Sequence, residues 1–318
     1  MSYKVASSCS EESDLSKIFK GNPDIDFKQI EKFNVKISKI RVKNKRGEEL
    51  IGKKIGYYST LELKKSPYYD NETMDKISLI IGEVLKEFIS MDSSKTALVV
   101  GLGNWNITPD SLGPKVISKL LVTRHFKKTL PEIGDGISSV CALSPGVLGI
   151  TGIETSEIVK SLVDKIKPDY VICVDSLAAR KVSRLNTTIQ IGNTGINPGA
   201  GVNNHRTPLN EETLGVPVIA IGIPTVVDIL TVVSDSVDLI LDKILEENED
   251  DILEKKFIYN RDKIEILRKN LLESMGEMIV APKDVEMIIE SMSKMIAMGI
   301  NIALNPSLDM ENINKIIN

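Results

Sequence analysis

Two aspartates stand at the ends of apolar segments that read as buried strands. Asp110 follows TALVVGLGN through the loop WNITP, and Asp175 directly ends YVICVD. Two carboxylates that face one water do not easily carry charge together, so their pKa values move apart. One can then take a proton from the water while the other gives a proton to a leaving amine. This pair could hydrolyse an amide bond without a nucleophilic Ser or Cys, although Asp at a strand end is common and the spacing alone is weak evidence.

Two polar residues lie close to these aspartates in the sequence. Asn104 precedes Asp110 within the same loop, and Arg180 follows Asp175 by five positions. Either side chain could orient a substrate or a carboxylate. We therefore name Asn104 and Arg180 as possible supporting groups, on sequence proximity alone.

The remaining reactive residue types offer less chemistry. Cys9, Cys141 and Cys173 are few and widely spaced, and no CxxC pair is present, which indicates a reducing compartment rather than a disulfide framework. His125 and His205 are the two histidines, and neither stands in a ligand or triad pattern. A Cys/His zinc site is therefore not expected.

The glycines after the first apolar strand resemble the beginning of a dinucleotide fingerprint. Gly101 and Gly103 fit GxGxxG, but the third position is Asn106 and the expected helix begins only after Pro109. The geometry that places a pyrophosphate at a helix start is thus not supported. We interpret the glycines as a tight turn that lets the backbone pass close to a substrate, and a nucleotide site is the alternative.

Composition limits the class of protein. The chain has 318 residues, 42% of them hydrophobic and 26% charged, which suits one large α/β domain with additions. The net charge of -4 gives no general attraction to nucleic acid. Lysine and arginine are concentrated between residues 32 and 65, which we interpret as a solvated hairpin. No secretory signal or membrane span is evident, so a cytoplasmic protein is expected.

The order of elements predicts an α/β fold with a mainly parallel sheet flanked by helices on both faces. A β-hairpin is expected at about residues 33–65, outside the main sheet, with KNKRGEE as its turn, after a mobile leader of about 30 residues. Helices are expected at 72–91, 110–122 and 156–166, at 226–247 packed against the sheet, and near 263–275 and 283–298. In such a sheet, substrates gather beyond the carboxyl ends of the strands, where both aspartates would lie.

Several long motifs together resemble the germination protease family of spore-forming Firmicutes. They span about Ile55 to Ala303 and are VVGLGNWNITPDSLGPK, LLVTRH, PGVLGITGIETSEIV, VDSLAAR, TTIQIGNTGINPGAGVNNHR, ETLGVPVIAIGIPTVVD and VAPKDVEMII. The resemblance implies a core similar to that of hydrogenase-maturation endopeptidases. It also implies a single peptidase domain over residues 15–318, with an N-terminal β addition (about 33–65) and a C-terminal helical extension (about 257–318).

The resemblance further implies an activity and its residues. The family cleaves small acid-soluble spore proteins, which coat DNA in dormant spores, and its proposed catalytic pair falls on Asp110 and Asp175. The hydrogenase-maturation relatives bind a metal through two acidic positions and a histidine. Since no histidine here stands in a matching motif, we expect a metal-free aspartate mechanism with no cofactor.

Processing and assembly are also implied by the resemblance. The family is made as an inactive precursor that removes its own leader, and Ser13-Asp14-Leu15-Ser16 matches the processing pattern. Cleavage is thus expected between Asp14 and Leu15, which makes residues 1–14 a propeptide. We also expect a homotetramer in the forespore or spore core, with DNA-bound spore proteins as substrates, no stable nucleic-acid binding and no membrane contact.

Two alternatives stay open at this point. One keeps the fold and makes Asp110 and Asp175 the ligands of a metal-dependent endopeptidase. The other is a nucleotide- or DNA-binding α/β module that uses the GLGN turn and the lysine-rich region at 32–65.

Overall fold

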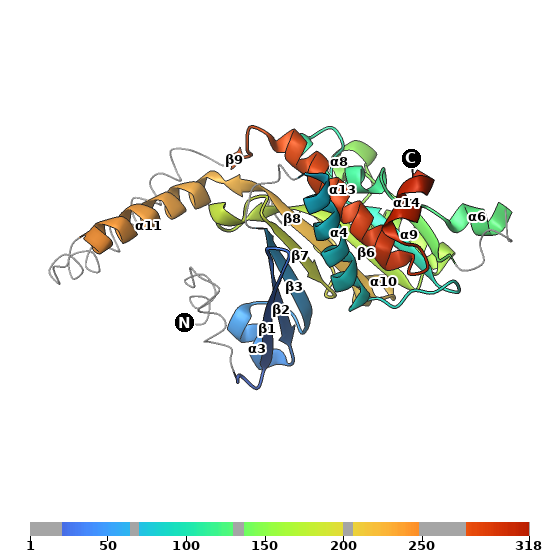
Figure 1. The fold of residues 1–318 in the computed structure, drawn as a ribbon, viewed down its shortest axis with the longest axis horizontal. Helices are drawn as coiled ribbons and strands as arrows, with labels where there is room; N and C mark the ends of the chain where they lie inside the picture. The colour runs from blue at the N-terminus through green and yellow to red at the C-terminus, as the bar shows by residue number, and fades with distance from the viewer. Residues whose placement is uncertain (1–20, 64–69, 130–136, 200–205, 248–277, 318) are drawn as a thin grey trace.

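A nine-stranded mixed sheet forms the centre of the molecule (Figure 1). The computed structural model describes residues 21–63, 70–129, 137–199, 206–247 and 278–317. The strand order is β1-β2-β3-β7-β8-β6-β4-β5, and β9 pairs with β8. The strands are β1 (Ile25–Lys32), β2 (Val35–Val42), β3 (Gly56–Leu63), β4 (Thr96–Gly101), β5 (Ser139–Leu143), β6 (Tyr170–Ala179), β7 (Thr188–Gly192), β8 (Val218–Asp228) and β9 (Ile279–Val280).

The α/β class is confirmed, but the expectation of a mainly parallel sheet is wrong. Only β5, β4, β6 and β8 run parallel to one another, whereas β1, β2, β3, β7 and β9 join by antiparallel pairing. The connection between β6 and β7 spans residues 180–187. A parallel crossover needs about a dozen or more residues, so this short connection returns the chain in the opposite direction.

The N-terminal strands belong to this same sheet, although we expected a hairpin outside it. β3 pairs with β7 from Tyr58↔Gly192 to Glu62↔Thr188, which joins β1, β2 and β3 to the main sheet as an N-terminal lobe. β1 begins at Ile25, within the stretch expected to be a mobile leader.

The segment expected as the hairpin turn contains a helix, α3 (Lys45–Ile51). The Asn44 side chain accepts a hydrogen bond from the Gly47 N–H and caps its start, and Gly52 ends it in the left-handed region with φ 66°. Gly47 packs against the Asp24 carbonyl, because a Cβ there would lie 2.8 Å from that oxygen. The charged composition of KNKRGEE concealed Asn44 as an N-cap, and Gly52, three residues after this segment, was not taken as a helix end.

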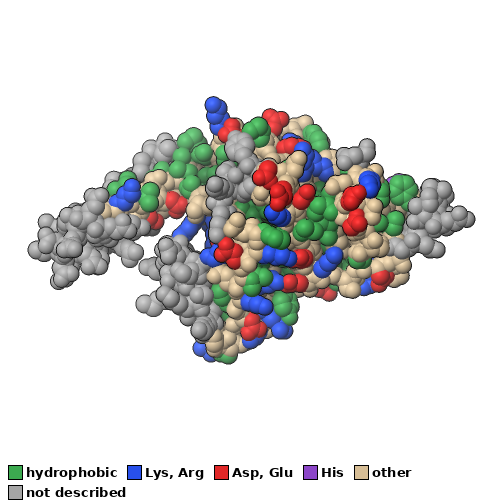
Figure 2. All heavy atoms as spheres, viewed as in Figure 1, with side chains coloured by type: hydrophobic (Ala, Val, Ile, Leu, Met, Phe, Trp, Pro, Cys, Tyr) green, Lys and Arg blue, Asp and Glu red, His purple; other side chains and the backbone are tan. Residues whose placement is uncertain are grey.

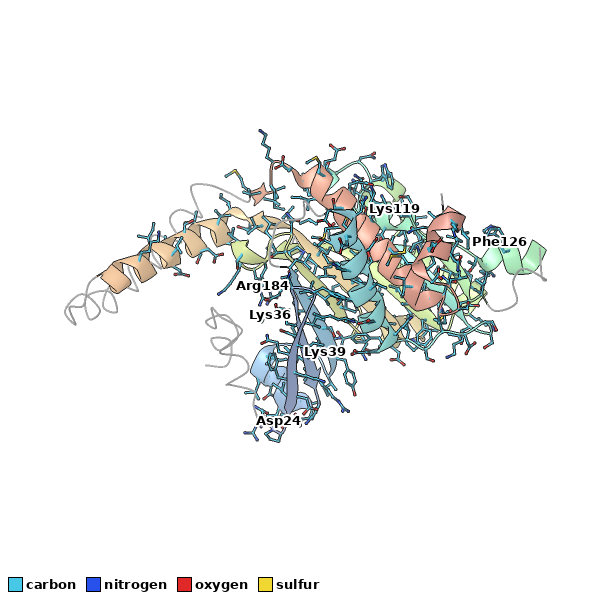
Figure 3. All side chains as sticks on the ribbon, in the orientation of Figure 1. Asp24, Lys36, Lys39, Lys119, Phe126 and Arg184 are labelled. Atoms are coloured by element: carbon cyan, nitrogen blue, oxygen red, sulfur yellow. The ribbon has the colours of Figure 1, made fainter. Side chains whose placement is uncertain are left out.

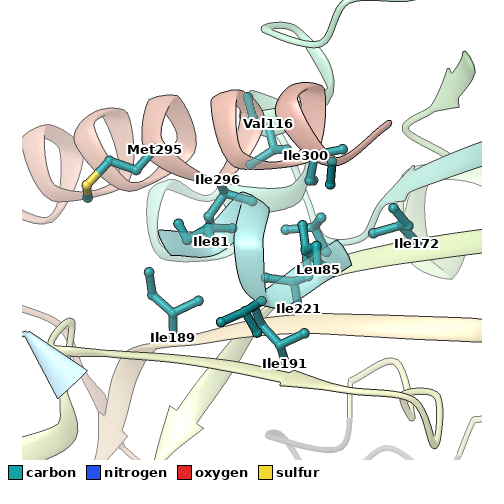
Figure 4. Close-up of a cluster of buried hydrophobic side chains, with 14 of the residues drawn as sticks. Ile81, Leu85, Val116, Ile172, Ile189, Ile191, Ile221, Met295, Ile296 and Ile300 are labelled. Carbon is teal, nitrogen blue, oxygen red and sulfur yellow. The ribbon is translucent and has the colours of Figure 1, made fainter. Parts of the chain in front are cut away.

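Helices cover one face of the sheet, and the largest apolar core lies between these helices and the strands. α4 (Asn71–Lys86), α5 (Leu112–Ile117) and α13 (Val285–Leu304) lie on this face. Figure 4 shows part of the core, with side chains from α4 and α13 above those of the strands: Ile81, Leu85, Ile296, Ile300, Ile172, Ile189, Ile191 and Ile221. The opposite face has a smaller core under α9 (Thr155–Ile166) and α10 (Glu211–Leu214).

α13 has the length and hydropathy of a membrane span, but it is a core helix. Within its most apolar window 72% of the residues are buried inside the molecule. The expected helix at 283–298 is thereby confirmed, as are those at 72–91 and 156–166. The expected helix at 110–122 is shorter, since α5 covers only Leu112–Ile117.

α11 (Ile229–Glu247) is a helix as expected, but it does not pack against the sheet. It extends away from the body of the molecule (Figure 1), and Leu239 and Ile240 are exposed. The apolar periodicity therefore predicted the helix correctly. The apolar side chains of Leu239 and Ile240, in its outer half, are not buried by the described residues of this chain. The helix expected at 263–275 lies outside the described residues.

Most described lysines of the N-terminal strands have acidic partners. Lys32 Nζ lies 2.7 Å from Glu83 of α4, Lys39 pairs with Glu87, and Lys43 Nζ lies 2.6 Å from Asp26. Figure 3 labels Lys39 on the N-terminal lobe, and Figure 2 shows basic and acidic side chains interspersed on this face. This arrangement agrees with a solvated, self-paired surface.

The contact between α4 and α13 supplies a stability test. A Cβ at Gly299 would lie 2.4 Å from Ile81 Cγ2, so Gly299→Ala should lower the free energy of unfolding by about 1–3 kcal/mol in urea denaturation. Gly149→Ala is the matched control, because nothing lies within 4 Å of the added methyl group. Equal stability of the two variants would show that the helices are not in close contact.

Candidate active site

Asp175 lies near the middle of β6 and not at its end as expected, because the pairing of β6 with β8 continues to Ala179. It is opposite Gly222 of β8, and it is 6% exposed. The Ser176 backbone N–H donates a hydrogen bond of 2.9 Å to Asp175 Oδ1. Burial between two neighbouring parallel strands therefore fixes this carboxyl group in a largely desolvated position.

Asp110 is held by the loop that follows β4. It ends a 3₁₀ turn, η2 (Thr108–Asp110), and is half-buried. The Asn104 backbone N–H donates to Asp110 Oδ2 at 2.8 Å and approaches the Asp110 carbonyl oxygen at 3.1 Å. The loop thus closes on itself and presents the carboxyl group beside the end of β6.

The glycines of this region make that closure possible. Gly103 has φ +109°, and a Cβ there would lie 2.0 Å from the Asp110 carbonyl oxygen. A Cβ at Gly113 would lie 2.2 Å from the Leu102 carbonyl oxygen and 2.7 Å from that of Val174. The glycines therefore let the Asp110 loop and α5 pack directly on β4 and β6.

Both aspartates line one cavity of about 400 Å³, which lies beyond the carboxyl end of β4 and alongside the second half of β6. Its walls are mostly apolar, and they include one cation, Arg206. The residues that complete the lining are Leu102, Gly103, Ile107, Pro109, Gly146, Val147, Thr155, Ser176, Leu177, Ala178, Pro198, Gly199, Thr225, Val226 and Ile279. We call it the aspartate cavity.

The two carboxyl groups differ in their electrostatic surroundings. Burial, followed by the nearby charge of Asp110, raises the pKa of Asp175 to about 8, against the smaller opposing effects of the Ser176 N–H and Arg206. Burial also raises the pKa of Asp110, but the Asn104 N–H and Arg206 oppose that rise. Asp175 is therefore the member of the pair that holds a proton near neutral pH.

Of the two predicted supporting residues, one lies beside the aspartates and the other does not contact them. Asn104 contacts Asp110 through its backbone N–H. Arg180 is exposed, and its charge acts on Lys53. Arg206 was not predicted as a site residue, although the length of the glycine- and asparagine-rich loop that contains it indicates a lip over the cleft.

Other predicted positions lie elsewhere or outside the described residues. Cys173 is buried beneath Asp175 and Cys141 is half-buried, both as free thiols. Asp14, Leu15 and His205 lie outside the described residues. Within the described ranges, no group of three or more His, Cys, Asp or Glu side chains could hold a metal ion.

Comparison with known proteins identifies the family. The family model described as germination protease matches residues 5–261. The chain belongs to the germination protease family. It is 51% identical over 304 residues to the germination protease of Clostridium tetani, which covers 93% of each chain. It is 42% identical over 315 residues to the germination protease of Bacillus subtilis, covering 87% of this chain and 85% of the relative.

Family membership makes this chain an endopeptidase that acts in spore germination. The resemblance seen in the sequence motifs is thereby confirmed. The roles of Asp110 and Asp175 within that activity stay predictions.

The raised pKa of Asp175 has a consequence for stability. A carboxyl group whose pKa is higher in the folded than in the unfolded state stabilises the fold at low pH, and this contribution is lost as pH rises from about 4 to about 8. Asp175→Asn should therefore raise the free energy of unfolding at pH 9 by at least about 1 kcal/mol and flatten its pH dependence. Urea denaturation from pH 5 to 9 measures this effect.

Asp164→Asn is the control, because its carboxyl group lies exposed on α9. It should leave the pH dependence unchanged. An Asp175→Asn protein that loses stability in parallel with the wild type from pH 5 to 9 would contradict the assignment of a buried proton to this residue.

Proposed function

We propose that this endopeptidase initiates the degradation of small acid-soluble spore proteins, using a water molecule shared between Asp110 and Asp175. The single observation that carries the proposal is the placement of both carboxyl groups on one cavity, with the pKa of Asp175 raised to about 8 by burial and by the charge of Asp110. The family supports the substrate class, because its members are proteases of germination.

The unequal surroundings of the aspartates suggest their roles. Asp110 is more exposed and receives the Asn104 N–H, so its ionised form is favoured and it acts as the base. Asp175 is buried and protonated, and it acts as the acid. Arg206 lines the cavity and its positive charge reaches both carboxyl groups, so it stabilises negative charge that develops on the peptide carbonyl oxygen.

The reaction then proceeds in two steps. Asp110 removes a proton from the water as the water oxygen bonds to the carbonyl carbon, which gives a tetrahedral intermediate with its charge on the former carbonyl oxygen. The carbon–nitrogen bond then breaks as Asp175 protonates the leaving amine. Proton transfer from Asp110 to Asp175, through the next water, restores the starting state.

The chain is further proposed to be a self-processing zymogen. Cleavage between Asp14 and Leu15 would remove residues 1–14 and leave residues 15–318 as the active peptidase. We place the active form in the cytoplasm of the forespore or spore core, as a homotetramer. The sequence around Asp14 and the family resemblance support this part of the proposal.

Replacing each aspartate by asparagine, which has the same shape but cannot transfer a proton in the same way, tests the mechanism. Asp110→Asn and Asp175→Asn should each lower the rate of cleavage of a purified small acid-soluble spore protein by at least about a hundredfold, because each removes one proton-transfer group. Circular dichroism checks that both variants keep the fold, and Asp164→Asn should cleave at the wild-type rate. Near-wild-type cleavage by either active-site variant would overturn the two-aspartate mechanism.

The same cleavage assay in the presence of a chelator distinguishes the metal-dependent alternative from the metal-free mechanism. Two carboxylates supply fewer ligands than the three protein groups that a catalytic zinc site normally has. We expect dialysed protein to retain its activity in EDTA. Loss of activity that is restored by a divalent cation would assign the aspartates to a metal instead.

Substitution of Asp14, the acidic residue before the proposed cut, tests the removal of the leader. Asp14→Asn should slow leader removal by the protein itself, with N-terminal sequencing as the readout, whereas a chain that begins at Leu15 should cleave spore protein without delay. Ser8→Ala, a change within the leader and away from the cut, is the control. Processing of Asp14→Asn at the wild-type rate and site would show that this residue does not direct the cut.

A further inference from the structure

A second cavity lies next to the aspartate cavity, over the antiparallel strands of the sheet. It has a volume of about 150 Å³ and is lined mainly by residues of β3, β7 and β8, together with Lys53 and Leu177. Leu177 lines both cavities and lies against Gly222, where a Cβ would be 2.4 Å from Leu177 Cδ1. We call this space the lysine cavity.

Strand register places the lysine cavity on the same sheet face as Asp175. Asp175 is opposite Gly222, Gly222 is opposite Gln190, and Gln190 is opposite Thr60. Residues that face each other in register point to the same side of a sheet. The face that carries Asp175 therefore continues across β8 and β7 to β3, floored by glycine and by short or half-buried side chains.

Lys53 gives this cavity its charge. Its Nζ lies 4.6 Å from the centre of the Tyr58 ring, and Tyr58 Oη donates a hydrogen bond of 2.7 Å to the Lys54 carbonyl oxygen, which fixes the ring. Lys53 has no carboxylate partner among the described residues, in contrast to Lys32, whose Nζ is paired with Glu83.

Further positive charge lies nearby. Burial, together with the charges of Arg184 and Arg180, lowers the pKa of Lys53 to about 8. In Figure 3, Arg184 lies where the N-terminal lobe meets the rest of the sheet. A buried cation among other cations is unfavourable unless an anion joins it. A carboxylate bound beside Lys53 would relieve this repulsion.

We propose that the lysine cavity is a substrate-binding subsite in which Lys53, with Arg180 and Arg184 nearby, takes the carboxylate of an acidic side chain of the substrate. This inference rests on the proposed function of the aspartate pair. Neighbouring strands are about 4.8 Å apart, so β3 lies roughly 14 Å from Asp175. An extended peptide advances about 3.3 Å per residue, so the acidic residue would lie about four or more positions from the scissile bond.

The first experiment measures cleavage of a peptide that spans a mapped cut in a small acid-soluble spore protein. Its acidic residues are replaced one at a time by the matching amide. Replacement of one acidic residue, about four or more positions from the cut, should raise KM roughly tenfold with little change in kcat. Lys53→Met should raise KM by a similar factor for the parent peptide, and it should add nothing for the peptide that already lacks this carboxylate.

Lys54→Met is the matched control, because its exposed side chain lies one residue away outside the cavity lining. It should leave KM unchanged for every peptide. If the effects of Lys53→Met and of each amide replacement multiply independently, Lys53 does not bind a substrate carboxylate and the proposal is wrong. A fall in kcat without a change in KM would also contradict it.

A binding measurement separates this proposal from the mechanism. The parent peptide and its amide partner are titrated into Asp175→Asn protein, with and without Lys53→Met, and the Lys53 ammonium is followed by NMR. The parent peptide should raise the pKa of Lys53, and the amide peptide should not. If Asp175→Asn still cleaves, the mechanism fails while this measurement still decides the subsite.

Competition with inorganic phosphate distinguishes a subsite for a substrate carboxylate from a site for a free phosphate ion. We expect millimolar phosphate to compete weakly and only with the acidic peptide. Equal inhibition of cleavage of both peptides by phosphate, abolished by Lys53→Met, would make the cavity a phosphate site and overturn the proposal.

Discussion

The burial of Asp175 beside a second carboxyl group is the constraint on which the rest of the site depends. A buried carboxylate is costly to ionise, and a neighbouring negative charge increases that cost. The protein reduces the conflict by giving the Asn104 N–H to Asp110 and by placing Arg206 on the same cavity. The result is an unequal pair, in which Asp175 holds its proton more tightly than Asp110 does. This division is what hydrolysis by a shared water requires.

The fold fixes the positions of both carboxyl groups of the pair. β6 lies between β4 and β8 and carries Asp175 to the edge of the core, while glycines let the Asp110 loop fold back onto β4. The antiparallel strands then extend the face that carries Asp175 toward Lys53. Departure from a purely parallel sheet thus creates a longer surface for a peptide than the parallel half alone would offer.

The sequence predicted those features that depend on local pattern. The aspartates were found because each follows an apolar run, and α4, α9 and α13 because their apolar periodicity is strong. The direction of β7 was not predicted, because a short strand has the same pattern in either orientation and only the length of its connection distinguishes them. α3 was missed because its N-cap, Asn44, lies in a charged segment and Gly52 was not taken as a helix end. Arg206 and Lys53 were missed because long-range folding, which one sequence does not display, brings them to the cavities.

The most direct measurement of the central claim is a titration of the two carboxyl carbons by NMR in protein labelled at aspartate. The account predicts that the pair titrates in two well-separated steps, the upper one near pH 8, and that Asp110→Asn lowers the upper value by removing the neighbouring charge. Two independent titrations near pH 4, each unaffected by substitution of the other residue, would contradict it.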